Sequence, residues 1–463
     1  MQEHLRRMDP VRLLLERDAR DGMKVPGLIF ADSYIQSLLE GDNALEQVAN
    51  VACLPGISRY SFAMPDIHWG YGFPIGGVAA FHADRGIISP GGVGYDISCG
   101  VRLLASRIPA SETIAVLDSL LAALFFSIPC GVGSRSGKKL SDRDLQGVLT
   151  EGAGWAVKEG FGTLEDLEHT EEKGCIRGAL PHEVSVRAKE RGRAQLGSLG
   201  SGNHFLEIQA VDEIFGPDAA RFGLEKGCTA VMIHCGSRGL GHQVCDDYLR
   251  VMARAMARYG IPVPDRQLCC APVTSEEGAR YLGAMRAAAN FALANRHMIA
   301  HGVRQVFERF FPGRHLFTVC DVSHNMAHME SHVTEGRKEE FCVHRKGATR
   351  AFAGQPVLIP GSMGTASFVL VGTKQAEMET FASTCHGAGR VLSRNEAVRR
   401  AQGQNLVTVM SERGISVMAE SPRTLGEEMP EAYKDVSRVV DVVREAGLSL
   451  KAARLRPLGV MKG

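Results

Sequence analysis

The sequence of 463 residues predicts an α+β fold, a single large domain in which mixed sheets are surrounded by helices. Short apolar runs that resemble buried strands end in polar, often glycine-rich turns, and one long segment repeats apolar residues at helical spacing. Strands and helices do not alternate regularly enough for a β/α barrel or a doubly wound sheet. The expected strands span residues 229–233, 316–320, 356–359 and 367–371.

The longest expected helix covers residues 274–311. Thr274 opens a capping box with the glutamate three residues later, and apolar residues then recur every three to four positions. A break is expected near Gly302. A second helix, capped by Ser111, is expected over residues 112–126.

Composition narrows the class of protein. Hydrophobic residues make up 44% of the chain and charged residues 23%, as in an ordinary folded protein. The net charge of +1 excludes the strongly basic character of a general nucleic-acid coat but allows a local basic groove. The N-terminus has no secretion signal, and no apolar stretch is long enough to cross a membrane, so we expect a soluble, cytoplasmic protein.

No internal repeat or long Pro/Ser linker divides the chain. We therefore expect residues 1–463 to form one domain, with residues 1–45 as an N-terminal extension packed on it. The 12 cysteines are scattered without a CxxC pair, which favours buried thiols in a reducing compartment.

Glycine is over-represented, at 52 of 463 residues, and the excess is concentrated in five polar blocks. Each block places glycines beside His, Asp, Asn or Arg, where the backbone can approach a ligand and successive N–H groups can bind an anion. One such block would indicate only a tight turn, whereas five favour a functional site. The blocks span residues 64–77, 89–102, 197–207, 234–242, and 360–367 together with 385–390.

Four of the five candidate metal ligands lie in these blocks, and the fifth, His324, follows one of the expected strands. Asp96 and Cys99 lie three residues apart in one turn, whereas His204, His234 and His324 can meet only through folding. A thiolate can bridge two cations, so the set suits a dinuclear site. Ligand softness alone favours zinc or iron. We assign structural or solvent-facing roles to other histidines, including His242, His328, His332 and His344.

Familiar nucleotide motifs are absent from the sequence. It has neither a Walker A motif nor the G-x-G-x-x-G dinucleotide fingerprint. It also lacks K-x-D-G, the lysine-nucleophile motif of ordinary nucleotidyltransferase ligases. A nucleotide site in this chain would therefore have to be of another kind.

The glycine-rich blocks, in this order, resemble those of the RtcB family of RNA-splicing ligases. The resemblance extends over essentially the whole chain, and the longer N-terminal segment is similar to the archaeal branch. The segments that carry it are G-G-V-G-Y-D-I-S-C-G-V-R (91–102), G-S-L-G-S-G-N-H-F-L-E (197–207), H-C-G-S-R-G-L-G-H-Q (234–243), P-G-S-M-G-T-A-S (360–367) and C-H-G-A-G-R (385–390).

This resemblance implies a GTP- and Mn²⁺-dependent ligase. Such an enzyme joins an RNA 3′-phosphate or 2′,3′-cyclic phosphate end to a 5′-hydroxyl end in tRNA splicing or RNA repair. His386 would take GMP as a histidine-guanylate and pass it on as an RNA(3′)pp(5′)G intermediate. A central cleft would hold metal and nucleotide. Two Mn²⁺ per subunit, in place of zinc or iron, would be bound by Asp96, Cys99, His204, His234 and His324.

The resemblance also implies a guanine site. Glu207 would accept hydrogen bonds from guanine N1–H and the exocyclic amine, a donor pair that adenine lacks, and Lys462 would donate to O6. Arg390 would contact phosphates, and Asp66 and His68 would support the site from behind. The implied GTP contacts are Asn203, Phe205, Glu207, Asn325, Pro360, Gly361, Ser362, Met363, Ser367, His386, Gly387, Ala388, Gly389, Tyr433 and Lys462.

Basic residues provide candidate RNA contacts with a salt-dependent contribution to binding. The expected partners are RNA ends such as tRNA halves or broken RNA, and an archease-like activator, with no membrane. We expect a monomer or weak dimer. Aromatic residues are only 6%, so extensive base stacking is not expected. The candidate phosphate contacts are Arg238, the cluster of Arg187, Lys189, Arg191 and Arg193, and a second cluster of Arg345, Lys346 and Arg350.

Two other functions remain open from the sequence. A metal-dependent phosphoesterase or cyclic phosphodiesterase acting on RNA ends could use the same metals without a nucleotide, and would not need His386, Glu207 or Lys462. A non-catalytic RNA- or nucleotide-binding protein would have no reason to assemble the five metal ligands.

Overall fold

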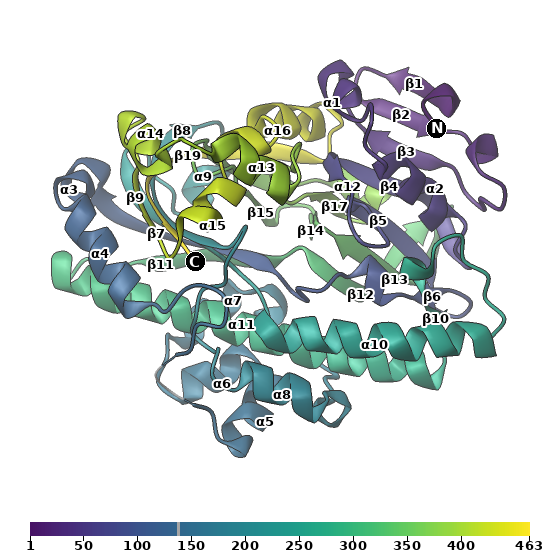
Figure 1. The fold of residues 1–463 in the computed structure, drawn as a ribbon, viewed down its shortest axis with the longest axis horizontal. Helices are drawn as coiled ribbons and strands as arrows, with labels where there is room; N and C mark the ends of the chain where they lie inside the picture. The colour runs from purple at the N-terminus through teal and green to yellow at the C-terminus, as the bar shows by residue number, and fades with distance from the viewer. Residues whose placement is uncertain (137–138) are drawn as a thin grey trace.

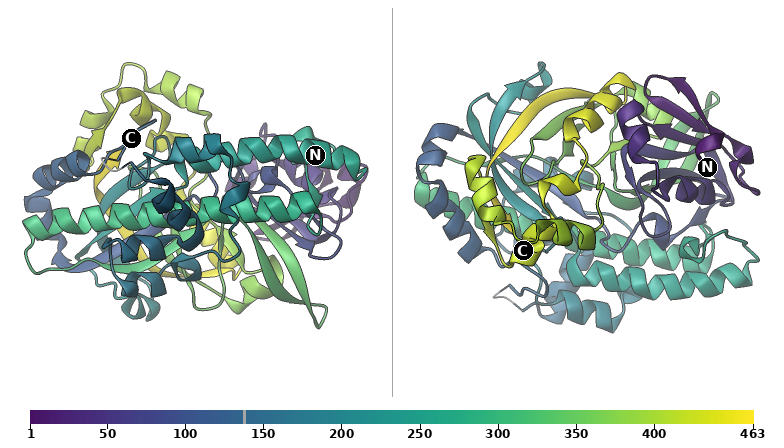
Figure 2. Two further views of the ribbon diagram at one scale, coloured as in Figure 1. Left: turned by 90° about the horizontal axis from the view of Figure 1, so that it is seen from below. Right: turned by 45° about the horizontal axis from the view of Figure 1, so that its top comes forward.

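The structure is a computed structural model that describes residues 1–136 and 139–463. Two large sheets lie side by side, and two long helices, α10 (Arg238–Arg258) and α11 (Glu276–Phe310), cross below them (Figure 1). These helices run alongside each other along the molecule (Figure 2). The mixed α+β architecture expected from the sequence is confirmed. Among the described residues, no helix combines the length and apolar character needed to cross a bilayer.

One sheet has seven strands within the described residues and begins with the N-terminal segment. Its first three strands come from residues 1–45, and β3 pairs in parallel with β4. The N-terminal residues 1–45 therefore form one edge of this sheet. In spatial order the strands are β1 (Leu5–Asp9), β2 (Arg12–Leu15), β3 (Gly27–Phe30), β4 (Ile57–His68), β5 (Ile75–His82), β13 (Arg337–Lys346) and β12 (Asn325–Thr334).

The other sheet has eight strands within the described residues, seven of them in its main path, and it carries most of the candidate site residues. β18 (Ser416–Ala419) joins it by pairing in parallel with β19. In spatial order the strands are β11 (Phe317–Ser323), β7 (Gly100–Pro109), β9 (Cys228–Cys235), β8 (Phe205–Ile214), β19 (Ser449–Lys462), β16 (Ser367–Gly372) and β15 (Pro356–Ile359), with β18 beside β19.

Shorter elements surround the sheets. Two-stranded pairs join β6 (Ile87–Ile88) to β10 (Ala271–Pro272) and β14 (Ala348–Arg350) to β17 (Ser383–Cys385). The remaining α-helices are α1 (Ser33–Leu38), α2 (Ala44–Ala52), α3 (Ala110–Ala115), α4 (Leu117–Ser127), α5 (Asp142–Glu151), α6 (Ala153–Lys158), α7 (Leu164–Glu168), α8 (Val186–Gly192), α9 (Asp218–Arg221), α12 (Lys374–Thr380), α13 (Arg394–Ala401), α14 (Leu406–Glu412), α15 (Pro422–Glu427) and α16 (Val436–Glu445).

The four expected strands are confirmed as β9, β11, β15 and β16, but both helix predictions need correction. The N-cap of α11 lies one residue later than predicted, because the Ser275 side chain, not that of Thr274, accepts the Gly278 N–H. The helix also continues without a break through Gly302. The segment 112–126 forms two helices, α3 and α4, because Val116 leaves helical geometry (φ −121°, ψ 11°), and Ser111 lies inside α3.

The register of the eight-stranded sheet explains why distant residues meet. Gly100, at the start of β7, pairs with Ser323 at the end of β11 and with the last residue of β9. Phe205, at the start of β8, pairs with His234 and with Lys462 near the end of β19. These neighbours are antiparallel, so starts and ends of strands share one edge. The side chains that flank these positions, Cys99, His204, His234 and His324, therefore gather there.

A fully buried ion pair fixes this edge. Arg296 of α11 donates to the Asp321 carboxylate of β11 from Nε at 2.9 Å and from Nη2 at 2.7 Å. Its Nη1 donates to the carbonyl oxygens of Ser98 at 2.7 Å and Cys235 at 3.0 Å. Arg102 donates to the same carboxylate from Nε at 2.7 Å. One carboxylate thus joins the long helix to two strands of the sheet.

Replacing Asp321 by alanine should destabilise the fold strongly. The change leaves two buried guanidinium groups without their counterion, a loss of about 3–5 kcal/mol in the free energy of unfolding. We expect a lower midpoint of thermal unfolding for Asp321→Ala. The control is Glu396→Ala, which removes a surface partner of Arg399 and Arg400 and should leave the unfolding midpoint almost unchanged. Equal midpoints for the two variants would contradict the structural role of the pair.

Candidate active site

Five predicted ligands meet at the edge of the eight-stranded sheet, with Cys99 at their centre. Its Sγ lies 3.3 Å from His204 Nε2 and 3.2 Å from His234 Nε2. His204 Nε2 lies 2.8 Å from Asp96 Oδ2, and His234 Nε2 lies 3.3 Å from His324 Nε2. The ligand atoms form two groups of three that share Cys99, with all atoms of a group within 4.8 Å of one another. This arrangement fits two cations bridged by one thiolate.

The electrostatics of these groups suit cation binding. Burial, together with neighbouring imidazoles, lowers the pKa of His234 and His324 well below the ordinary value, so both rings are in the neutral form that binds metals. Burial opposes ionisation of Asp96, but His204 outweighs it and lowers the pKa of that carboxyl. Burial, with Asp96 adding to it, raises the pKa of Cys99 to about 12. A bound cation would supply the charge that stabilises the thiolate.

Glycines leave the space that the candidate ligands occupy. A Cβ at Gly236 would lie 2.3 Å from Asp96 Oδ1, and a Cβ at Gly200 would lie 1.9 Å from His204 Nδ1. Asn325 also orients the turn that carries Asp96 and Cys99, because its Nδ2 donates to the Asp96 carbonyl oxygen at 3.2 Å. The glycine excess in the sequence therefore reflects close packing of backbone against ligand side chains.

His386 is held by a buried carboxylate. Its Nδ1–H donates to Asp66 Oδ2 at 2.6 Å, and the backbone N–H groups of His386 and Gly387 donate to the same oxygen at 3.0 and 3.3 Å. None of these bonds involves Nε2 of His386, and the ring lies 4.7 Å from the His324 ring. Gly389 is required here, since it has φ +74° and its Cβ would lie 2.2 Å from the Asp66 carbonyl oxygen.

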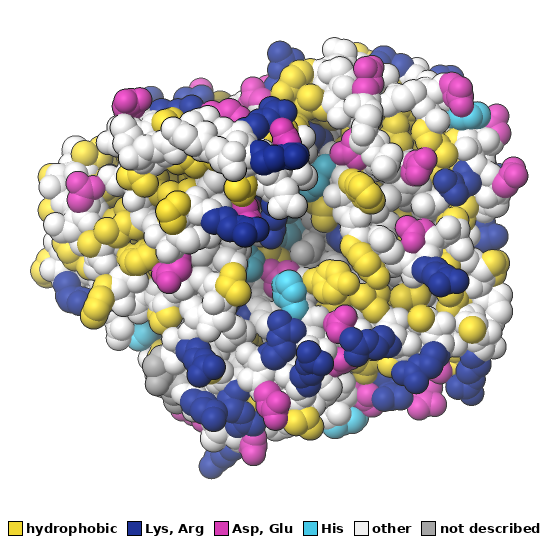
Figure 3. Space-filling view, in the orientation of Figure 1, with side chains coloured by type: hydrophobic (Ala, Val, Ile, Leu, Met, Phe, Trp, Pro, Cys, Tyr) yellow, Lys and Arg dark blue, Asp and Glu magenta, His cyan; other side chains and the backbone are white. Residues whose placement is uncertain are grey.

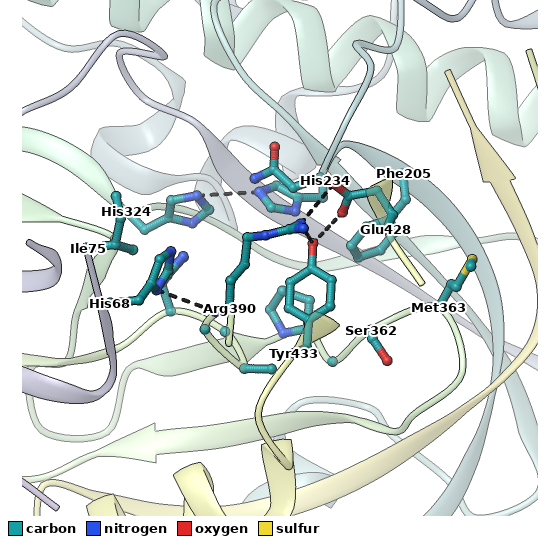
Figure 4. A pocket seen from close by; sticks show the side chains of 18 of the residues that line it. His68, Ile75, Phe205, His234, His324, Ser362, Met363, Arg390, Glu428 and Tyr433 are labelled. Atoms are coloured by element: carbon teal, nitrogen blue, oxygen red, sulfur yellow. Dashed lines mark hydrogen bonds and ion pairs between the residues drawn. The ribbon is translucent and has the colours of Figure 1, made fainter. Parts of the chain in front are cut away.

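A cavity of about 220 Å³ opens beside His386 (Figure 4). It is lined by most of the side chains predicted to contact nucleotide, together with two of the metal candidates and His68. Glu207 and Ser367 do not line it. The predicted residues in its wall are His68, Asn203, Phe205, His234, His324, Asn325, Pro360, Gly361, Ser362, Met363, His386, Gly387, Ala388, Gly389, Arg390, Tyr433 and Lys462.

Glu207 and Ser367 lie behind this wall as part of a buried polar chain. Glu207 is on the same face of β8 as Phe205, two residues away. Gln209 Nε2 donates to Glu207 Oε2 at 2.8 Å and to Ser367 Oγ at 3.1 Å. Burial raises the pKa of Glu207 to about 7, although Lys462 opposes the shift. A ligand with paired N–H donors would compensate the buried carboxylate.

Four residues of the cavity wall were not among the predicted site residues: Ile75, Gly347, Arg394 and Glu428. Glu428 is buried at the end of α15, outside every glycine-rich block, so no local pattern marks it. Arg390 Nη1 donates to Glu428 Oε1 and to the Tyr433 hydroxyl, both at 3.1 Å (Figure 4). Lys462 Nζ lies 3.6 Å from the Glu428 carboxylate. Glu428 therefore positions two cationic side chains of the cavity, Arg390 and Lys462.

The predicted phosphate contacts divide into buried and exposed groups. Arg238 is 8% exposed, outside the cavity wall, and donates to the Gly131 carbonyl oxygen and Ser134 Oγ, both at 3.1 Å. Arg187 is exposed on α8 and Lys189 is half-buried. The second predicted cluster, Arg345, Lys346 and Arg350, does not form a basic surface patch. Arg345 and Lys346 are buried, and Arg350 pairs with acidic side chains. That part of the RNA-surface prediction is wrong.

The shared position of Cys99 makes it the most sensitive metal candidate. Cys99→Ala should reduce the number of divalent cations bound per chain, because both ligand groups lose a donor. We would load the protein with Mn²⁺ or Zn²⁺ and measure metal per chain by elemental analysis. Cys228→Ala, at the opposite end of β9, is the control and should bind as the unmodified protein does. An unchanged metal content in Cys99→Ala would remove the thiol from the site.

Comparison with known proteins gives the family. A family model described as tRNA-splicing ligase RtcB matches residues 47–463. The chain is 50% identical over 483 residues to the tRNA-splicing ligase RtcB of Archaeoglobus fulgidus, with all of both chains covered. It is 52% identical over 478 residues to that of Thermococcus kodakarensis, with 99% of each covered. It is also 52% identical over 434 residues to the RNA-splicing ligase RtcB of Mycobacterium tuberculosis, covering 90% of this chain and 100% of the relative. The chain therefore belongs to the RtcB family of tRNA-splicing ligases.

Proposed function

We propose that this chain is a GTP- and Mn²⁺-dependent ligase that joins RNA 3′-phosphate or 2′,3′-cyclic phosphate ends to 5′-hydroxyl ends in tRNA splicing or RNA repair. Family membership supports the ligase class. The observation that carries the mechanism is the orientation of His386, whose Nδ1 is held by Asp66 while its ring lies 4.7 Å from the ring of the metal candidate His324. A phosphodiesterase acting without a nucleotide would need no such nucleophile, and is not favoured.

The donor set supports two divalent cations. Asp96, Cys99 and His204 would hold one cation, and Cys99, His234 and His324 would hold the other. Imidazole and carboxylate groups suit Mn²⁺, which the family resemblance favours over the zinc suggested by the thiolate. Bound there, the cations would neutralise phosphate charge beside His386.

His386 would act as a nucleophile through Nε2. The nitrogen attacks the α-phosphorus of GTP, and a P–N bond forms as the bond to the pyrophosphate oxygen breaks. Asp66 keeps the proton on Nδ1 and stabilises the positive charge that develops on the ring. Pyrophosphate leaves, and the histidine carries the guanylyl group.

Two further displacements would complete ligation. An oxygen of the RNA 3′-phosphate attacks the guanylyl phosphorus, which releases His386 and forms RNA(3′)pp(5′)G. The 5′-hydroxyl of the second strand then attacks the RNA 3′-phosphorus, loses its proton, and GMP departs. A 2′,3′-cyclic end must first be opened by water to the 3′-phosphate. These steps account for the need for a nucleotide, because a phosphate monoester has no good leaving group.

The guanine site would recognise its base through Glu207 and Lys462. Guanine N1–H and the exocyclic amine would donate to Glu207, and Lys462 would donate to O6. Tyr433 and Ser367 would complete the pocket. Because burial raises the pKa of Glu207 to about 7, the ionised carboxylate depends on Lys462 and on the donors of the bound base.

The first test is covalent labelling with α-labelled GTP and Mn²⁺. The protein should take up label that is stable to base and released by acid, because a P–N bond has these properties. His386→Ala should take up none, and Asp66→Asn should label more slowly, because Nδ1 loses its charged acceptor. His315→Ala, which changes an exposed histidine, is the control and should label normally. No label on the unmodified protein would refute the proposed function.

The second test compares GTP with ITP, whose base lacks the exocyclic amine. The concentration that gives half-maximal labelling of the unmodified protein should be at least about tenfold higher for ITP than for GTP. The reason is that one oxygen of the Glu207 carboxylate would lose its hydrogen-bond donor. Glu207→Ala should bind GTP more weakly and should lose the preference over ITP. Glu213→Ala, at the far end of the same strand, should retain it. A preference that survives in Glu207→Ala would assign guanine recognition to another residue.

A further inference from the structure

A group of ring side chains lies outside the nucleotide cavity, beside Asp96. Tyr71 and Tyr95 meet edge to face with ring centroids 5.3 Å apart, and Tyr95 lies 6.1 Å from the ring of His242 on α10. The two tyrosines are partly exposed and His242 is exposed. Trp69, two residues before Tyr71 in the same loop, is 59% exposed. The proposed function uses none of these rings.

The ring group adjoins the more open side of the metal candidates. Tyr95 directly precedes Asp96, whose side chain is 16% exposed, whereas His234 and His324 are buried beside the nucleotide cavity. Asp96 is thus the most exposed of the five candidate ligands, and Tyr95 is its neighbour in the chain. The space-filling view shows a hollow at the centre of this face with histidine side chains in it (Figure 3).

Buried groups fix the two loops that carry Tyr71 and Tyr95. Lys346 Nζ donates to the carbonyl oxygens of Tyr71 and Gly91, the latter at 3.2 Å, so one buried side chain fixes both loops that carry the tyrosines. Tyr95 also packs against a hydrophobic core that includes α10 and α11. Rings held in this way would bind a planar base at low cost in side-chain entropy.

Helix α8, which carries exposed arginines, packs against α10 next to His242. Arg191 of α8 donates to Gln243 Oε1 at 3.1 Å, and Gln243 directly follows His242. Arg187 lies one helical turn before Arg191 on the same exposed face. Lysines and arginines form a band below the hollow, over α8 and α10 (Figure 3).

We propose that Tyr71, Tyr95 and His242 form a stacking platform for the terminal nucleobase of an RNA strand, and that Arg187 and Arg191 bind the phosphates that follow. The inference rests on the proposed function and assigns the surface by which an RNA end approaches. Unpaired bases stack on aromatic and histidine rings without regard to sequence, and arginines bind backbone phosphates. GTP would occupy the cavity beside His386, so RNA and nucleotide would approach from different sides.

The test uses RNA strands with a terminal 2-aminopurine, whose fluorescence falls when the base stacks. One strand ends in a 5′-hydroxyl and the other in a 3′-phosphate, and each is titrated separately. At least one should be quenched by the unmodified protein. Tyr71→Ala and His242→Ala should lose the quenching and raise the apparent KM for RNA about tenfold, with a smaller change in kcat. His242→Tyr keeps a ring and should retain much of both.

Salt dependence tests the basic helix. Arg187→Ala and Arg191→Ala should each reduce the slope of log binding constant against log salt concentration by about one. Arg254→Ala is the matched control, because this arginine is exposed farther along α10, and it should leave the slope unchanged.

The outcomes separate this inference from the proposed function. The strand that shows quenching identifies which RNA end uses the platform. Quenching by neither strand, or quenching that survives in both alanine variants, would overturn the platform. Slopes that are equal in all three arginine variants would overturn the phosphate contacts. Failure of the unmodified protein to take label from GTP would instead refute the ligase mechanism, and the fluorescence would still report whether a base stacks.

Discussion

The candidate active site depends on one buried carboxylate, Asp321, and the two arginines that share it. Arg296 also donates hydrogen bonds to the carbonyl oxygens of Ser98 and Cys235. These two residues are adjacent in the chain to Cys99 and His234. A buried ion pair contributes little net stability, because desolvation offsets most of the attraction. Its consequence here is geometric, since it sets the spacing between two strand ends that carry metal candidates. The long helix α11 thereby acts as a rigid support for a site to which it contributes no ligand.

The same arrangement recurs at His386 and at the cavity wall. Asp66 holds His386, and Glu428 holds Arg390 and Lys462, and both carboxylates are buried. In each case the acid and its partner come from distant parts of the sequence. Such support residues set the tautomer and orientation of functional groups, and their loss would misplace those groups without removing them. The precision of the site thus comes from three buried acids rather than from the glycine-rich loops alone.

The sequence predicted what is local and missed what depends on packing. The strands before His234, His324 and Ser362 were predictable, because apolar runs end at polar glycine-rich turns. Glu428 was missed because no glycine or charge pattern surrounds it. Arg345 and Lys346 were misjudged as surface residues, because β13 lies between β5 and β12 and its C-terminal half is buried. The break between helices α3 and α4 at Val116 was also missed, because no proline or glycine lies there. Position within a sheet, not residue type, decided the burial of Arg345 and Lys346.

The net charge of +1 acquires a different meaning once these pairs are known. Arg102, Arg296 and Arg345 are fully buried and matched by internal carboxylates, so total charge does not describe the surface that a substrate meets. The exposed arginines of α8 form a short basic face, not a continuous groove. Short basic faces neutralise few phosphates and so give modest, salt-sensitive binding. On the proposed function, affinity would therefore have to come from the strand end itself, where a terminal base and a phosphate near the cations are both bound. Under that proposal, a near-neutral protein would select RNA ends over RNA in general.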